Sequence, residues 1–257
     1  MTESSRRKFL ARAAATMSAA VLAGCDKISQ STWGPNVLRS AEQLTHTVQR
    51  AITNRHALAP EFTKADIAPI FRANGTLNPD SNDYNAHVET GFRNWRVAVR
   101  GLVHKPVDLS MADLRATPSR TQITRHDCVE GWSCIGEWTG APLSEIIIQA
   151  EPKRHARFVV FHCADNMSDN DEPAKFYYES LDIIEAMHPQ TILAYDLNGK
   201  PLPVANGAPV RLRAERQLGY KMAKYVNGIE LVHDFSHING GKGGYWEDQG
   251  YNWWAGI

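Results

Sequence analysis

The chain has few cysteines and no excess of charge of either sign. Four cysteines in 257 residues are too few for a scaffold that depends on disulfides, and a chain of this length buries a core without them. The 28 basic residues balance the 28 acidic ones, and four of the basic residues, but only one acidic residue, lie in the first 24 positions. The remainder is therefore slightly acidic. Without a basic surface to neutralise phosphates, we expect no nucleic-acid partner.

Long hydrophobic runs are also missing. The small-residue run at 11–24 contains Arg12 and is shorter than the ~20 residues that a membrane-spanning helix needs, and no other stretch is long enough. The pair Arg6-Arg7, followed by Phe9-Leu10, comes just before this run. The segment therefore resembles a twin-arginine export signal. The alternative is an ordinary amphipathic helix with a chance pair of arginines.

The end of the same segment resembles a lipobox. In Leu22-Ala23-Gly24-Cys25, Cys25 would be acylated and become the first mature residue. The two resemblances imply a periplasmic protein, exported folded by the twin-arginine route and lipid-anchored at the inner membrane through Cys25. They also imply a cofactor, because that route serves enzymes that receive one in the cytoplasm. We expect an export signal over residues 1–25, an arm that wraps the domain over 26–81, and one catalytic domain over 82–257.

The remaining pattern predicts short strands interrupted by single helices. Trp95, Val97 and Val99 alternate with less apolar residues, which is typical of a strand with one buried face. Further strands are expected at 122–125, 157–162, 210–213 and 228–232, with a hairpin over 191–202 that turns at Asn198-Gly199. Helices are expected at 40–54, at 111–116 after the cap Ser110, at 143–150, and at 181–187 after the cap Ser180. Strands and helices do not alternate regularly, so the fold class is α+β.

The residues around Cys128 are the strongest candidate for chemistry. Cys128 follows a predicted strand, and Gly131 permits a tight turn directly after it. We expect Arg125 and His126 to favour the thiolate through their positive charge, and a thiolate is the natural protein ligand for a thiophilic metal. The alternative is a buried structural cysteine, since a free cysteine behaves as a small hydrophobe.

Two other chemical interpretations remain open at this stage. A tetrahedral zinc site would use Cys128, Cys134, His126 and the pair His162-Cys163. Its cysteine spacing is wider than usual, and adjacent residues of one strand point to opposite faces. A nucleophile and base made of Cys128 and His126 lacks the required orientation, because both lie on the same face of an extended strand.

Five motifs in order resemble one known family. They are CVEGWS at 128–133, WTGAPL at 138–143, HPQT at 188–191, NGAPVR at 206–211 and GYK at 219–221. Together they resemble the molybdopterin domain of the sulfite oxidase family, over residues 82–257. The branch they are most similar to contains the exported bacterial proteins related to the catalytic subunit of periplasmic methionine sulfoxide reductase.

The resemblance implies molybdenum bound to a single molybdopterin, with Cys128 as the one protein ligand and catalytic residue. It places Asn206, Arg211, Met222, Ala223 and Lys224 where relatives hold the pterin. Cys163 stands where relatives have a pterin-contacting side chain, often a threonine. Asn85 and His87 lie in the region where the family wraps a first pterin-binding loop. A short segment is also rich in basic residues, which we expect to bind the pterin phosphate. These residues are Arg211, Arg213, Arg216, Lys221 and Lys224.

The departures from the family pattern bear on the substrate. Sulfite-oxidising members carry an arginine shortly after the metal cysteine, whereas this chain has Trp132, Ser133 and Cys134 there. We therefore expect a neutral pocket with aromatic walls, in which Tyr177 and Tyr178 are candidates for the entrance. Such a pocket suits an uncharged S-oxide or N-oxide, either small or protein-bound, better than a dianion. Arg125 or Arg216 would be the source of any positive charge.

The resulting hypothesis is a molybdoenzyme that reduces an oxide by two-electron oxygen-atom transfer. The alternatives are a sulfite dehydrogenase and, from a different class, a cofactor-free lipoprotein binding module or a zinc hydrolase. We expect neither the additional dimerisation domain of the family nor a haem-binding segment. A membrane-bound haem subunit or a periplasmic cytochrome is then the expected electron partner of a monomeric catalytic subunit. The aromatic C-terminal residues 240–257 are expected to pack back on the domain.

Overall fold

The computed structural model describes residues 34–168 and 173–257, which form two compact units divided after Ile52. The predicted export signal and the lipobox at Cys25 lie outside the described residues. The described part of the first unit is helix α2 (Gly34–Ile52), which confirms the helix expected near residues 40–54. Within the described ranges, no helix combines the length and the apolar character needed to cross a membrane.

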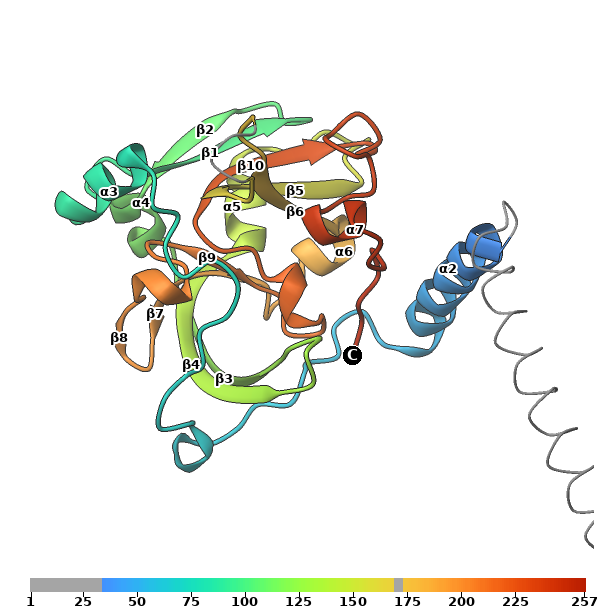
Figure 1. Cartoon of the computed structure of the whole chain (residues 1–257), viewed down its shortest axis with the longest axis horizontal. Coiled ribbons are helices and arrows are strands. Elements are labelled where there is room, and N and C mark those ends of the chain that lie inside the picture. The colour runs from blue at the N-terminus through green and yellow to red at the C-terminus, as the bar shows by residue number, and fades with distance from the viewer. Residues whose placement is uncertain (1–33, 169–172) are drawn as a thin grey trace, which may run out of the picture. The chain divides into compact units, whose positions relative to one another are not determined.

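Two five-stranded sheets organise the second unit (Figure 1). In the first sheet β1 pairs in parallel with β10, and the other neighbours are antiparallel. Its order is β2 (Val107–Ser110), β1 (Arg96–Gly101), β10 (Val226–Val232), β5 (Phe158–Asn166) and β6 (Phe176–Asp182). The second sheet has the order β3 (Arg120–Asp127), β4 (Ser133–Pro142), β7 (Ile192–Leu197) and β8 (Lys200–Pro201), with β9 (Arg211–Arg213) paired to β7.

Short helices connect these strands, so the predicted α+β class is confirmed. They are α3 (Asn82–Glu89), α4 (Met111–Ala116), α5 (Leu143–Gln149), α6 (Ile183–Ala186) and α7 (Tyr245–Asp248), with single 3₁₀ turns at Lys64–Asp66, Val204–Asn206 and Gly219–Lys221. Helix α4 begins as predicted, because the Ser110 side chain accepts from the Asp113 backbone N–H. The predicted turn at Asn198-Gly199 is also present, and both residues have positive φ, as a type I′ hairpin requires.

The largest hydrophobic core is built by the alternating buried residues of these elements. Val97, Val99, Ile146, Phe161 and Leu212 belong to it, and each is fully buried. Trp95 is also buried, and its indole N–H donates to the Val226 carbonyl oxygen, which satisfies the polar atom of this large side chain. The predicted inward face of β1 is therefore correct.

One predicted helix start is wrong. Ser180 was expected to cap a helix, but it lies within strand β6. Its hydroxyl donates to the Gly243 carbonyl and accepts from the indole N–H of Trp253 at 2.8 Å. The cap of α6 is Asp182, whose side chain accepts from the Glu185 N–H at 2.8 Å. Partners that are distant in sequence therefore decide the role of Ser180.

Residues 61–71 run along the β3–β4 hairpin before the first sheet begins. The Phe62 N–H donates to the Ile123 carbonyl at 2.8 Å, and the Ala68 N–H donates to the Ile135 carbonyl at 3.0 Å. Further along, Phe71 is buried, with its ring 4.9 Å from that of Trp138. This path carries residues 71–76 to the end of the hairpin, where the candidate site lies.

Candidate active site

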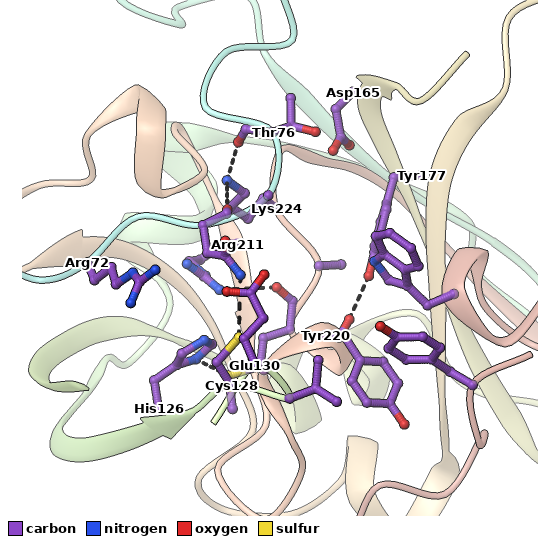
Figure 2. A pocket seen from close by; sticks show the side chains of 18 of the residues that line it. Arg72, Thr76, His126, Cys128, Glu130, Asp165, Tyr177, Arg211, Tyr220 and Lys224 are labelled. Carbon is purple, nitrogen blue, oxygen red and sulfur yellow. Dashed lines mark hydrogen bonds between the residues drawn. The ribbon is translucent and has the colours of Figure 1, made fainter. Parts of the chain in front are cut away.

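A cavity of about 200 Å³ opens where strand β3 ends (Figure 2). Its walls come from segments spread over the whole second unit, so the tertiary fold, not a local motif, assembles it. The lining residues are Phe71, Arg72, Asn74, Gly75, Thr76, His126, Cys128, Val129, Glu130, Asp165, Met167, Tyr177, Arg211, Gly219, Tyr220, Met222, Ala223, Lys224, Trp246 and Tyr251.

Cys128 lies in the turn between β3 and β4 as a half-buried free thiol. Its N–H donates to the Trp132 carbonyl at 2.9 Å, and its own carbonyl accepts from the Gly131 N–H at 3.0 Å. Gly131 has φ +85°, which glycine adopts without strain. The side chain of Asn74 donates to the Cys128 sulfur at 3.4 Å. The turn therefore fixes the backbone of Cys128 while its sulfur lines the cavity.

The structure contradicts the expectation that Arg125 and His126 favour the thiolate form of Cys128 through their positive charge. Burial, followed by the nearby Arg213, lowers the pKa of His126 well below its usual value, so this ring is neutral at pH 7. Its Nδ1 lies 3.0 Å from Nη1 of Arg213, which can only donate. Arg125 is bound to Asp127 at 2.9 Å and does not line the cavity. The prediction that His126 and Arg125 activate Cys128 through their charge is therefore wrong.

Three of the five basic residues expected to grip a phosphate hold buried carboxylates instead. Arg213 binds Glu215 at 2.6 Å, Arg216 binds Glu185 at 2.5 Å, and Lys221 binds both Glu179 and Glu247 at 2.5 Å. These ion pairs neutralise the positive charges of Arg213, Arg216 and Lys221. Of the predicted five, Arg211 and Lys224 line the cavity.

Arg211 and Lys224 are cations in a region with little access to solvent. Burial, followed by Arg213, lowers the pKa of Arg211 to about 9, and its Nε has no hydrogen-bond partner among the described residues. Burial, followed by Arg211, lowers the pKa of Lys224 to about 7. Among the described residues, neither forms an ion pair with a carboxylate. An anionic ligand would therefore be stabilised between them.

Asp165 faces the same cavity, near Thr76 (Figure 2). Burial raises its pKa to about 6, and its Oδ1 has no hydrogen-bond partner within the described chain. A ligand that donates an N–H or O–H would satisfy this oxygen. Cys163, on the same strand, is buried, and burial raises the pKa of its thiol well above the usual value. It does not line the cavity.

Aromatic side chains form another wall, as the sequence predicts. The Tyr177 hydroxyl donates to the Tyr220 carbonyl at 2.6 Å (Figure 2). The Trp246 ring stacks on Tyr251 with centroids 5.3 Å apart, and Tyr220 meets Tyr251 edge-on at 5.3 Å. The C-terminal segment therefore packs back on the domain, as expected. Tyr178 is not part of this wall, because its hydroxyl donates to Asp248 at 2.7 Å.

Arg72 makes the cavity less neutral than predicted. Its guanidinium lies over the Trp132 ring, 4.6 Å from the centroid, and Arg72 lines the cavity. The Trp132 indole N–H donates to Glu130 at 3.0 Å, and Glu130 lines the same cavity as Cys128 (Figure 2). Neither Arg125 nor Arg216, the two candidates named from the sequence, supplies the cavity's charge.

The structure brings together only some of the predicted site residues. Cys128, Arg211, Met222, Ala223 and Lys224 line the cavity. Asn206 lies behind the wall, where its carbonyl accepts from Arg211 at 3.0 Å and its side-chain nitrogen has no partner within the described residues.

Asn85 and His87 lie on helix α3 and do not line the cavity. The amide of Asn85 points to Asp80 at 3.5 Å, and the His87 ring packs 5.1 Å from the Trp95 ring. Residues 71, 72 and 74–76 line the cavity instead. Sequence reasoning missed them, because Asn74-Gly75 shows only a turn.

The group implied by the resemblance, a molybdenum bound by a pterin with a phosphate tail, suits these residues. Cys128 offers one soft thiolate, and Arg211, Asn206 and Asp165 each retain an unsatisfied buried polar atom. Arg211 and Lys224 offer positive charge for a phosphate. The predicted zinc ligands are not gathered at Cys128, because Cys134 and Cys163 do not line the cavity and His162 pairs with Glu230 at 3.0 Å. No group of three or more His, Cys, Asp or Glu side chains that could hold a metal occurs in residues 34–168 and 173–257.

Comparison with known proteins agrees with this chemistry. YedZ1 of Azospira oryzae, to which the role of a protein-methionine-sulfoxide reductase subunit has been assigned, is 34% identical over 98% of this chain and 87% of its own. The protein-methionine-sulfoxide reductase catalytic subunit MsrP of Campylobacter jejuni is 37% identical over 55% of this chain, which matches 50% of the length of that relative.

A solved structure, the sulfane dehydrogenase SoxCD from Paracoccus pantotrophus, aligns with a TM-score of 0.48 at 21% identity, over 55% of this chain and 39% of that one. The family model described as "Oxidoreductase molybdopterin binding domain" matches residues 85–238. The chain therefore belongs to the family of the oxidoreductase molybdopterin binding domain, and it is an oxidoreductase that depends on a molybdenum cofactor.

Proposed function

We propose that this protein reduces S-oxides of the methionine sulfoxide type, either small or protein-bound, by two-electron oxygen-atom transfer. The observation that carries the proposal is the half-buried free thiol of Cys128 in a cavity that has one aromatic wall, the buried Arg211 and the half-buried Lys224. The names of the two relatives described above support the substrate class.

The overall reaction converts R₂S=O, two electrons and two protons into R₂S and water. The bound cofactor supplies a metal that accepts an oxygen atom and exchanges two electrons. The chain must then bind the apolar groups on sulfur, for which Trp246 and Tyr251 provide the surface. It must also deliver protons to the departing oxygen. Glu130 and Asp165 are the carboxyl groups among the lining residues, and we assign this role to Glu130, which follows Cys128 by two positions (Figure 2).

The cofactor would be held by residues from the predicted set. Cys128 would bind the metal, and Arg211 and Lys224 would attract the phosphate of the pterin. Met222 and Ala223 would contact the cofactor from the same wall. The further residues Asn206, Cys163, Asn85 and His87 stay predictions, of which Asn206 is supported by its unsatisfied amide.

Substitution of the metal ligand tests the proposal. Cys128→Ser should lower S-oxide-dependent oxidation of a reduced viologen by at least about 100-fold, while the protein stays folded. Cys134→Ala is the matched control, because Cys134 is a buried free thiol that does not line the cavity. Metal analysis of the wild type should give close to one molybdenum and one pterin per chain. A wild type without molybdenum, or a fully active Cys128→Ser variant, would refute the proposal.

Arg72 favours a second candidate, the sulfite dehydrogenase. A guanidinium at the cavity would stabilise a sulfite dianion, which a neutral pocket would not. If sulfite is the substrate, Arg72→Leu should raise its KM strongly and leave S-oxide turnover nearly unchanged. Arg93→Leu serves as the control, because Arg93 is exposed and does not line the cavity. If the wild type does not oxidise sulfite, this candidate is rejected.

We also propose a location and an electron partner. The twin-arginine pattern supports export to the periplasm, and the lipobox supports a lipid anchor at Cys25. Both relatives are named as subunits, so we expect this protein to work with an electron partner. We expect a monomeric catalytic subunit that receives electrons from a membrane-bound haem subunit or a periplasmic cytochrome. Cell fractionation of a wild type and an Arg6→Lys, Arg7→Lys double variant tests the export route. A variant that still reaches the periplasm would contradict it.

A further inference from the structure

Asn74 connects the segment before the first sheet to the candidate metal ligand. Its side-chain nitrogen lies 3.4 Å from the Cys128 sulfur, and it donates an N–H to that sulfur. We infer that Asn74 is a positioning residue that lowers the electron donation of the Cys128 sulfur to the metal. This inference rests on the proposed function, because it requires Cys128 to bind molybdenum.

The loop that carries Asn74 is held in place by Lys224. The Nζ of Lys224 donates to the backbone carbonyls of Asn74 at 2.8 Å, Ala205 at 3.1 Å and Thr76 (Figure 2). In its protonated form Lys224 has three N–H donors, and these three contacts use all of them. The Tyr225 hydroxyl adds a second bond to the Thr76 carbonyl, at 2.8 Å. The backbone on both sides of Gly75 is therefore fixed.

The acceptor is fixed as well. The backbone of Cys128 is held by the hydrogen bonds of the β3–β4 turn, at 2.9 Å to Trp132 and 3.0 Å to Gly131. Donor and acceptor thus belong to two segments that are separately anchored to the same domain. The backbones of donor and acceptor are therefore held in place independently, and the exposed Asn74 side chain reaches the sulfur from a fixed loop.

A hydrogen bond to a thiolate withdraws electron density from the sulfur. A metal bound by that sulfur becomes easier to reduce, and hydrogen bonds to ligand sulfurs are among the factors that set the potential of metal centres. Asn74 is neutral and contacts the sulfur directly, whereas Arg211 and Lys224 act through charge. Removal of the amide should therefore lower the reduction potential of the metal without removing the metal.

The test compares Asn74→Leu with wild-type holoenzyme. The measured quantities are the molybdenum content, the midpoint potential of the metal from a redox titration followed by electron paramagnetic resonance, and kcat and KM for an S-oxide. Asn74→Leu should keep its molybdenum and shift the equilibrium toward the oxidised metal about tenfold, which is about 59 mV for the one-electron step that electron paramagnetic resonance follows. Asn78→Leu is the control, because Asn78 belongs to the same exposed region but does not line the cavity.

The outcomes separate this inference from the proposed function. A fully loaded Asn74→Leu variant with the wild-type potential and spectrum overturns the inference and leaves the proposed function intact. If Asn74→Leu does not fold, Asn74→Ala, which only removes atoms, is measured in the same way. Folded variants that lose their molybdenum also overturn the inference, because they would assign Asn74 to retention of the cofactor. A wild type without molybdenum overturns the proposed function itself.

Discussion

Replacement of Lys221 by methionine should destabilise the protein strongly. Lys221, Glu179 and Glu247 are at most 1% exposed, and the lysine nitrogen lies 2.5 Å from each carboxylate. Methionine retains most of the side-chain length but leaves two carboxylates without their cation. Loss of one partner from a buried ion pair costs about 3–5 kcal/mol, so we expect the free energy of unfolding at pH 8 to fall by about that amount.

The loss of unfolding free energy in Lys221→Met should depend on pH. Burial, followed by the charge of Glu247, raises the pKa of Glu179 well above its usual value, while Lys221 opposes this shift. This pKa is raised even with Lys221 present, and removing the lysine removes the charge that opposes the rise, so the folded variant binds a proton at Glu179 still more tightly than the unfolded chain does. The stability of the variant should therefore be highest below the usual glutamate pKa of 4.5 and should fall as pH rises toward the folded-state pKa. The difference from wild type should be smaller at pH 5 than at pH 8.

Urea unfolding followed by tryptophan fluorescence at both pH values measures this effect. Lys105→Met is the matched control, since Lys105 forms an exposed pair with Glu151 at 3.9 Å and should contribute less than about 1 kcal/mol. If Lys221→Met costs no more than the control, or costs the same at pH 5 and pH 8, the buried carboxylates do not depend on this lysine and the reasoning fails.

Two further predictions concern the sheet and the aromatic wall. Gly140→Ala should destabilise the protein by more than about 3 kcal/mol, because the new Cβ would lie 2.2 Å from the Leu193 carbonyl oxygen in the paired strand, and urea unfolding would show it. If Gly140→Ala had the same urea midpoint of unfolding as the wild type, strands β4 and β7 would be able to move apart at little cost in free energy. Trp246→Ala should raise the KM for an S-oxide at least about tenfold and lower kcat less, because it removes binding surface. An unchanged KM in steady-state assays would show that the substrate binds elsewhere.

The elements that sequence predicts well are those determined by local patterns. The alternation around Val97 and Val99 predicts β1, and the cap at Ser110 predicts α4, because burial and capping depend on neighbouring residues. Ser180 shows the limit of such reasoning. Its hydroxyl binds Gly243 and Trp253, and no local signal announces partners so far along the chain.

Some residues of the candidate site can likewise be predicted from local sequence, and others cannot. Cys128 and Arg211 can be found from motifs, because the chemistry of a metal ligand and of an anion contact demands particular residue types. Composition alone does not distinguish Arg213, which is paired with Glu215, from Arg211, which forms no ion pair among the described residues. Arg72 and Asn74 were missed because their segment reaches the cavity only through its path along the β3–β4 hairpin.

The residues that line the cavity are widely spaced along the chain. The first is Phe71 and the last is Tyr251, so the cavity is complete only when the segment between them has been synthesised and folded. A cofactor bound there would contact side chains from several separate segments of the domain at once. It would therefore act as a non-covalent crosslink, and its binding would stabilise the folded domain.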